Sequence, residues 1–249
     1  MKINRSTSLP LDKFIEFALY DEDTGYYMKK NPFGIDGDFI TSPNITSLFS
    51  EIIAIWIITF WKSMGAPEKF NILELGAGNG EMMKVIVSTL KNFPECFNSC
   101  NFLIHEKSFF LKKQQQKNLK LENIMWQDDI NKLDHQPTIF LANEFFDALP
   151  IKQFFKKKEG WVERFVNFKK LDQAKFEEQF IDIKDIEKKL NFEISKNQET
   201  IEFSPNSFEY LKDICNIISK NDGGLLIIDY GYMDARMHET LQAINNHKY

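Results

Sequence analysis

A short apolar run ends on an acid, and three alternating glycines follow, in the stretch ILELGAGNGEMM at residues 72–83. The acid is Glu74, and the glycines are Gly76, Gly78 and Gly80. Glycine permits positive φ and a close approach of the backbone to a ligand, so the stretch is either a ligand site or a tight strand-to-helix turn. A dinucleotide fingerprint needs a small residue where this chain has Glu81, and a Walker A loop needs a Gly-Lys-Ser/Thr sequence that is missing. We therefore predict a ligand other than a dinucleotide or a nucleoside triphosphate.

Further acids follow the next two predicted strands. Glu106 ends the strand at 101–106, where a carboxylate can accept hydrogen bonds from both hydroxyls of a ribose. The alternative is a surface acid that precedes a helix. Asp128 and Asp129, in WQDDI, follow a short strand near 123–126. A carboxylate there can accept from an adenine amino group, and a helix N-cap or a turn is nearly as good an interpretation.

The stretch LANEFFDALP places three more polar residues after a fourth strand, at 138–143. Asn143, Glu144 and Asp147 are expected at the same edge of the sheet, which suits a substrate site. The two phenylalanines between the acids either line that site or pack in the core.

All these residues depend on strands that end at one edge of a sheet, and the hydrophobic periodicity predicts such strands. The predicted strands are 70–75, 101–106, 123–126 and 138–143. The predicted helices around them are 11–20, 47–63, 79–91 and 108–119. Alternating strands and helices are typical of an α/β fold with a mainly parallel sheet and helices on both faces.

The segments outside this alternation have other patterns. Residues 21–44 are rich in Gly, Pro, Asp and Asn and predict a long loop, and residues 151–168 predict a β-hairpin around Glu159-Gly160. Residues 169–200 are strongly charged and predict a solvated insertion or a surface helix. A helix at 204–220, with Ser204 as N-cap and Pro205 at its first position, precedes a buried strand at 223–231.

Composition excludes several classes of protein. The formal net charge of −5 argues against an electrostatic nucleic-acid binder. Three cysteines, with no surrounding cluster of ligands, predict free thiols and no metal site. The apolar run at 52–61 has only about half the length of a membrane span, so we expect a core helix and no integral membrane segment. The N-terminus has no signal-peptide pattern and no evident transit peptide, so we expect a bacterial cytoplasm rather than a mitochondrial matrix.

The glycine spacing also matches E-x-G-x-G-x-G, the first motif of S-adenosylmethionine-dependent methyltransferases, in which the glycines make room for the methionine and ribose parts of the ligand. The chain as a whole resembles the MidA-like methyltransferases, a family that includes a mitochondrial complex I assembly factor that methylates arginine. The matching segments occur in the family's order and span nearly the whole chain. They are LDKFIEFALYDEDTGYY, NPFGIDGDFITSPNI, LFSEIIAIWI, ILELGAGNG, ANEFFDALPI, SP at 204–205, LLIIDYG and ETLQAINNHKY.

This resemblance implies a Rossmann-like class I methyltransferase fold with S-adenosyl-L-methionine as cofactor. Residues 1–65 would form N-terminal helices and a substrate and cofactor loop, and residues 66–249 the core, with an insertion at about 151–200. The implied substrate is a protein arginine, by analogy in a subunit of respiratory complex I. Gly37, Asp38 and Phe39 match the family's GDF loop, followed by Thr41-Ser42-Pro43, and this loop is expected to close over the cofactor.

The resemblance and the residues together give a set of expected site residues. An arginine needs carboxylates that orient its planar fork and offset its charge, and we expect Glu144 and Asp147 in that role, with Asp38 as a third candidate. The expected cofactor-binding residues are Gly37, Asp38, Glu74, Gly76, Gly78, Gly80, Glu106, Asp128 and Asn143.

The chain departs from the family pattern at three places. Asn44 stands where the family usually has Glu, which removes a carboxylate that could orient a guanidinium, and the glycine loop reads GAGNG rather than GPGRG. The family also continues past His247-Lys248-Tyr249, so we expect a sheet that lacks its last strands. Two alternatives to the arginine assignment stay open, namely a non-catalytic assembly factor that binds a respiratory subunit and a small-molecule methyltransferase.

Overall fold

A computed structural model of the 249-residue chain describes residues 7–29, 32, 34, 37–39, 41–120, 123–168 and 173–243. They form two compact units. The first takes the described residues up to Tyr26, together with Leu149–Phe208 and Gly231–Ala243; the second takes those of Tyr27–Ala148 and Glu209–Tyr230. The boundaries of these units differ from the boundary predicted between residues 65 and 66. The predicted division into a substrate and cofactor segment and a methyltransferase core stays a prediction.

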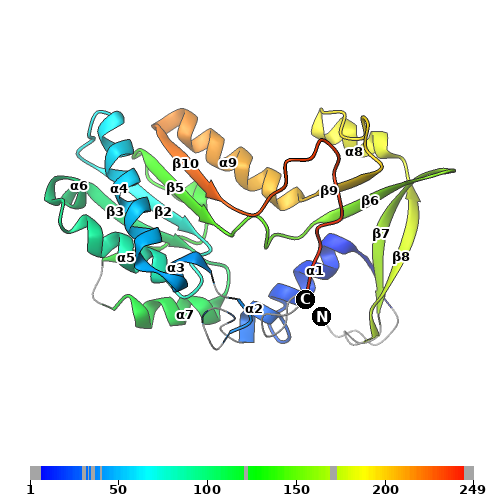
Figure 1. Cartoon of the computed structure of the whole chain (residues 1–249), viewed down its shortest axis with the longest axis horizontal. Coiled ribbons are helices and arrows are strands. Elements are labelled where there is room, and N and C mark those ends of the chain that lie inside the picture. The colour runs from blue at the N-terminus through cyan, green and yellow to red at the C-terminus, as the bar shows by residue number, and fades with distance from the viewer. Residues whose placement is uncertain are drawn as a thin grey trace. The chain divides into compact units, whose positions relative to one another are not determined.

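The second unit is built on a parallel sheet with the strand order β10-β5-β2-β3-β4 (Figure 1). Its strands are β2 (Phe70–Leu75), β3 (Cys100–His105), β4 (Ile124–Trp126), β5 (Thr138–Asn143) and β10 (Gly223–Ile228). All six residues of the central strand β2 are buried, as expected for a strand covered on both faces. All five predicted strands are present, and the parallel pairing brings their carboxyl ends to one edge. The prediction of a buried strand at 223–231 is corrected, because β10 ends at Ile228 and is only partly buried, with Ile227 45% exposed.

Helices cover both faces of this sheet. On one face, α4 (Ser47–Ser63) and α5 (Glu81–Leu90) pack against Ile72, Ile139 and their neighbours. On the other face, Ile214 and Ile217 of α9 (Pro205–Asn221) pack against strand residues such as Leu73. Successive residues of a strand point to opposite faces, so the unbroken apolar strands supply both layers. The α/β prediction is confirmed.

The helix predicted from the apolar run at 52–61 is α4, and its boundaries match the prediction. Ile53, Ile57 and Trp61 are buried on one side, while Ile52 and Ile55 on the other side are exposed. Within the described ranges, no helix combines the length and the apolar character that crossing a bilayer requires. The run is explained by packing of α4 on the sheet.

The remaining helices of the second unit are short. They are α3 (Ser42–Ile45), α6 (Pro94–Ser99), α7 (Phe109–Asn118) and the 3-10 helix η1 (Ile130–Lys132). One more turn, α2 (Tyr26–Lys29), lies at the boundary of the units. The prediction of an uninterrupted loop at 21–44 is thus wrong where α2 and α3 form, and α6, which starts at Pro94, was not predicted.

The first unit is an antiparallel sheet with two helices. Its strands are β1 (Thr7–Pro10), β6 (Lys152–Lys157), β7 (Gly160–Phe168), β8 (Lys175–Ile181) and β9 (Thr200–Phe203), and its helices are α1 (Leu11–Tyr20) and α8 (Ile183–Leu190). The predicted hairpin β6–β7 is present, with its turn at Lys158-Glu159, one residue earlier than predicted; Gly160 is the first residue of β7 and pairs with Lys157. The charged insertion contains a surface helix, α8, as predicted. It also contains a strand that was not predicted, the exposed β8, which pairs along β7.

A buried ion network joins α1 to the hairpin in this unit. The Lys152 ammonium lies 3.0 Å from a carboxylate oxygen of Asp12 and 2.6 Å from one of Glu163. Both acids are buried, and the lysine side chain is 23% exposed. Apolar contacts complete the core: α8 packs with Phe154 and Ile201 on one side of the sheet.

Candidate active site

The predicted glycine loop connects β2 to α5 in the second unit. Gly76, Gly78 and Gly80 have φ values of 64°, 54° and 84°, in the left-handed region where glycine is favoured. Gly76 has a second requirement, because a Cβ there would lie 2.8 Å from the Phe145 ring. Part of the glycine pattern is therefore explained by the tight turn from β2 to α5 and by its packing.

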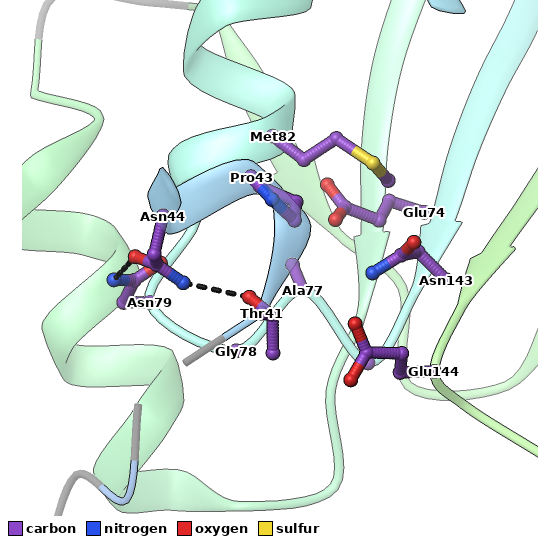
Figure 2. A pocket seen from close by; sticks show the side chains of 11 residues that line it. Thr41, Pro43, Asn44, Glu74, Ala77, Gly78, Asn79, Met82, Asn143 and Glu144 are labelled. Carbon is purple, nitrogen blue, oxygen red and sulfur yellow. Dashed lines mark hydrogen bonds between the residues drawn. The ribbon is translucent and has the colours of Figure 1, made fainter. Parts of the chain in front are cut away.

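A cavity of about 40 Å³ lies beside this loop (Figure 2). Three segments line it: the end of β2 with the glycine loop and α5, the end of β5, and residues 41–46, which we call the strap. The lining residues are Thr41, Pro43, Asn44, Glu74, Gly76, Ala77, Gly78, Asn79, Met82, Asn143 and Glu144. The volume holds about three water-sized groups, so a larger ligand requires the lining to move.

Glu74 and Asn143 turn unpartnered oxygens to this region. Glu74 is 3% exposed, and neither its Oε2 nor the Oδ1 of Asn143 has a hydrogen-bond partner within the described residues. Burial, and secondarily the charge of Glu106, raise the pKa of the Glu74 carboxyl to about 8. Buried acceptors without donors are rare in proteins, so the two oxygens suit a ligand that brings hydrogen-bond donors or positive charge, as the ammonium and sulfonium groups of S-adenosylmethionine do.

An asparagine pair joins the strap to the glycine loop. The Asn79 side-chain amide donates to Asn44 Oδ1 over 2.7 Å, and Asn44 in turn donates to Thr41 Oγ1 over 2.7 Å (Figure 2). Asn79 Oδ1 also accepts from the backbone N–H of Glu81 at the start of α5. The sequence flagged Asn44 only as a missing carboxylate, and its contact with Asn79 was not predicted.

Glu106 stands at the end of β3, as predicted, and already has protein partners. Its carboxylate accepts from Ser108 N–H over 2.8 Å and from the Gln115 amide over 2.9 Å, and burial raises its pKa. Gln115 is fully buried and donates to the carbonyl of Gly78 as well. Glu106 does not line the cavity, so its expected role toward a ribose stays a prediction. Gln115, which ties it to the glycine loop, was missed.

The structure places Asp128 away from the cavity. Its side chain is 81% exposed and lies 2.8 Å from the Lys112 ammonium, whose hydrogen bond and charge lower the pKa of the carboxyl. The neighbouring Asp129 accepts from Asn131 N–H and caps η1, which is the alternative foreseen for this pair. A contact of Asp128 with an adenine stays a prediction that this geometry does not support.

Glu144 and Asp147 lie on one turn that follows β5. Glu144 lines the cavity and has a left-handed φ of 49°, and its Oε2 accepts from the Tyr230 hydroxyl over 3.3 Å. Burial raises the pKa of Glu144. Asp147 is exposed on the turn, and partial desolvation together with the charges of Asp229 and Glu144 raises its pKa to about 6. Phe145 and Phe146 pack in the core of the unit, so the packing alternative holds for them.

The GDF loop is only partly brought to the site. Gly37 donates its N–H to the carbonyl of Gly34, and Asp38 is buried at 4% exposure, but neither residue lines the cavity. Thr41, Pro43 and Asn44, a few residues later, do line it. The cofactor roles of Gly37 and Asp38 and the catalytic role of Asp38 stay predictions.

Comparisons with known proteins place this site in context. Residues 52–249 match a family described as "Putative S-adenosyl-L-methionine-dependent methyltransferase". The chain is 27% identical to the protein arginine methyltransferase NDUFAF7 of Xenopus tropicalis and 26% identical to that of Homo sapiens, over 99% of this chain and 63% and 61% of theirs. The chain thus spans less than two thirds of the length of these curated relatives.

A solved structure shows the same fold. The protein from Burkholderia thailandensis, crystallised with S-adenosyl-homocysteine, superposes with a TM-score of 0.70 over 84% of this chain and 55% of its own, at 21% identity. The class I Rossmann-like prediction is confirmed by this likeness. The family match confirms the resemblance stated from the sequence, together with S-adenosyl-L-methionine as the family's cofactor.

Proposed function

The chain belongs to that family of S-adenosyl-L-methionine-dependent methyltransferases, and from this premise we propose that it methylates arginine in a protein substrate. The observation that supports arginine as the methyl acceptor is the turn after β5. There Glu144 and Asp147 present two carboxylates with raised pKa beside the cofactor cavity. The relatives named arginine methyltransferases support the same acceptor. A subunit of respiratory complex I as substrate and a bacterial cytoplasm as location stay predictions.

The chain's residues would divide the work as follows. When bound, S-adenosylmethionine would supply the methyl group to a nucleophile and would leave as S-adenosyl-homocysteine. The glycine loop would hold the cofactor by letting the backbone approach it closely. Glu74 and Asn143 would bind it through their two unpartnered oxygens.

Glu144 and Asp147 would act on the acceptor. A guanidinium is cationic at neutral pH, so carboxylates are needed to orient its fork and to offset the charge while the new nitrogen–carbon bond forms. The nitrogen then gives up a proton. Asp147, with a pKa of about 6, is close enough to neutral pH to receive it, whereas an ordinary aspartate is a much weaker base.

Transfer of a labelled methyl group to an arginine-containing peptide tests this proposal, with the same peptide carrying lysine as control. We expect Glu144→Gln to lower turnover by at least about a hundredfold, because the amide cannot offset the guanidinium charge. Calorimetric binding of S-adenosyl-homocysteine should stay within about threefold of the unchanged chain.

Other results would point elsewhere. Cofactor binding with no transfer to any protein acceptor would favour the non-catalytic assembly factor. Equal turnover by Glu144→Gln would remove Glu144 from the acceptor site.

A further inference from the structure

Asp229 is the first residue after β10, and the mechanism above does not use it. Strand β10 pairs with β5 so that Ile228 lies opposite Asn143. Asp229 and Glu144 therefore leave two neighbouring strands at the same edge of the sheet.

The Asp229 carboxylate is bonded to the backbone of the acidic turn. Its Oδ2 accepts from the N–H groups of Phe146, over 3.0 Å, and Asp147, over 3.2 Å. Its Oδ1 accepts from the N–H of Tyr230 over 2.8 Å. Both oxygens thus bind backbone, and one of them joins the end of β10 to the turn after β5.

The backbone at Glu144 explains why the turn needs such a restraint. Its φ of 49° is uncommon for a residue with a side chain and is stable only where neighbouring bonds enforce it. The Glu144 N–H donates to the carbonyl of Ile228 over 2.8 Å, so β10 and Asp229 together hold the turn at three amides.

We propose that Asp229 is a positioning residue of the candidate site, which holds the turn carrying Glu144 and Asp147 and so sets the direction of both carboxylates. This inference rests on the proposed function, since it concerns the groups assigned to the acceptor. Asp229 also contributes to the raised pKa of Asp147, where its charge is the second cause after burial. Tyr230 adds to the arrangement through its hydroxyl bond to Glu144.

Amide hydrogen exchange tests the restraint without any activity. In the 249-residue chain, Asp229→Ala should speed the exchange of the Phe146 and Asp147 amides by about tenfold or more, because both lose their acceptor. Asp229→Asn keeps one carbonyl oxygen and should retain part of the protection. Asp213→Ala is the matched control, since among the described residues Asp213 accepts from the Asn131 side chain and not from the acidic turn, and it lies on α9 of the same unit.

Methyl transfer then tests the consequence. We expect kcat to fall roughly tenfold to a hundredfold in Asp229→Ala, because small misplacements of reacting groups have effects of that size. Binding of S-adenosyl-homocysteine should stay within about threefold. In Asp229→Asn, the acidic limb of the pH–rate profile should move to lower pH, since the charge that raises the pKa of Asp147 is gone.

Each outcome decides the proposal. Unchanged exchange at both amides in Asp229→Ala overturns it, whether or not the chain transfers methyl groups. Faster exchange with full turnover overturns it as well, because the turn then need not be held for catalysis. Faster exchange in a chain whose unchanged form transfers no methyl group supports the restraint and counts against the proposed function alone.

Discussion

At the scale of single residues, Glu74 should make ligand binding at the cavity depend on pH. Burial raises the pKa of its carboxyl to about 8, so most molecules carry a neutral Glu74 at pH 7. A cation beside its unpartnered Oε2 would favour the ionised form. Binding of a cationic ligand should then release a proton, and a ligand that releases a proton binds more tightly as pH rises.

We expect S-adenosylmethionine to release close to one proton on binding at pH 7, and its affinity to rise by up to about tenfold between pH 7 and pH 9. Calorimetry in two buffers of different ionisation enthalpy counts the protons. S-adenosyl-homocysteine, which lacks the sulfonium charge, should release fewer. Glu74→Gln is the control and should show no buffer dependence; equal heats in both buffers with the unchanged chain would contradict the prediction.

The same carboxyl should make folding dependent on pH. In the unfolded chain Glu74 ionises near its ordinary pKa of about 4.3, whereas in the folded chain it keeps its proton up to about pH 8. Its contribution to stability therefore falls as pH rises through that window. Urea unfolding of Glu74→Gln and the unchanged chain should give similar free energies near pH 4, with the variant increasingly more stable toward pH 8. A difference that is constant with pH would show that the carboxyl does not titrate in this way.

Several site residues could be predicted from sequence because their positions follow from the topology. Glu74, Gly76, Asn143 and Glu144 come at the ends of buried parallel strands, and such ends meet at one edge. Asp229 has the same signal, a polar residue directly after the apolar strand LLII, but its role depends on which turn its carboxylate reaches. Contacts of that kind are decided by three-dimensional packing and leave no local pattern.

At the scale of elements, the strap and the glycine loop are held together by the side chains of Asn44 and Asn79. The cavity between these elements is small, so a nucleoside-sized ligand requires its lining to move, and we expect the strap to be the part that moves away from the loop. The Asn44–Asn79 bond opposes that movement. A neutral hydrogen bond of this kind stabilises the closed strap by about 1 kcal/mol, and its loss should speed ligand exchange several-fold.

We expect Asn44→Ala to speed both the association and the dissociation of S-adenosyl-homocysteine by roughly fivefold, as measured by stopped-flow fluorescence or surface plasmon resonance. A double-mutant cycle with Asn79→Ala isolates the pair from the other bonds of each residue. Asn118→Ala is the matched control, because Asn118 bonds the Asn79 carbonyl and not the strap. Additive effects of the two alanine changes would show that the bond does not govern ligand exchange.

The elements themselves were predictable where hydrophobic periodicity was strong. The boundaries of α4, β2 and β5 match the prediction, since long apolar or amphipathic runs specify their own class of structure. By contrast, β8 has the sequence KFEEQFI and is almost wholly exposed. It is a strand because it pairs along β7, and no local pattern of apolar residues predicts that pairing.

At the scale of the whole molecule, the first unit depends on its buried ion network. Removing the Lys152 ammonium would leave Asp12 and Glu163 buried without their shared cation. Breaking a buried pair is strongly destabilising because it leaves uncompensated charge.

We expect Lys152→Met to lower the free energy of unfolding by about 3 kcal/mol, the low end for such a loss, because the lysine is partly exposed. Lys157→Met on the same strand is the control, since Lys157 pairs with Glu178 at the surface and should lose less than about 1 kcal/mol. Urea unfolding measures both. Equal effects of the two changes would show that burial of the network adds nothing.

The pairing of β10 with β5 has a consequence for biosynthesis. Between these two neighbours in the sheet, the chain runs through the hairpin, β8, α8, β9 and α9. A nascent chain leaves the ribosome from its N-terminus, so the glycine loop can form long before β10 emerges. Until Asp229 has left the exit tunnel, the turn at Glu144 lacks every bond from β10 that holds its unusual backbone. The order of synthesis thus lets the cofactor side of the site form first and delays the acidic side until β10 is in place.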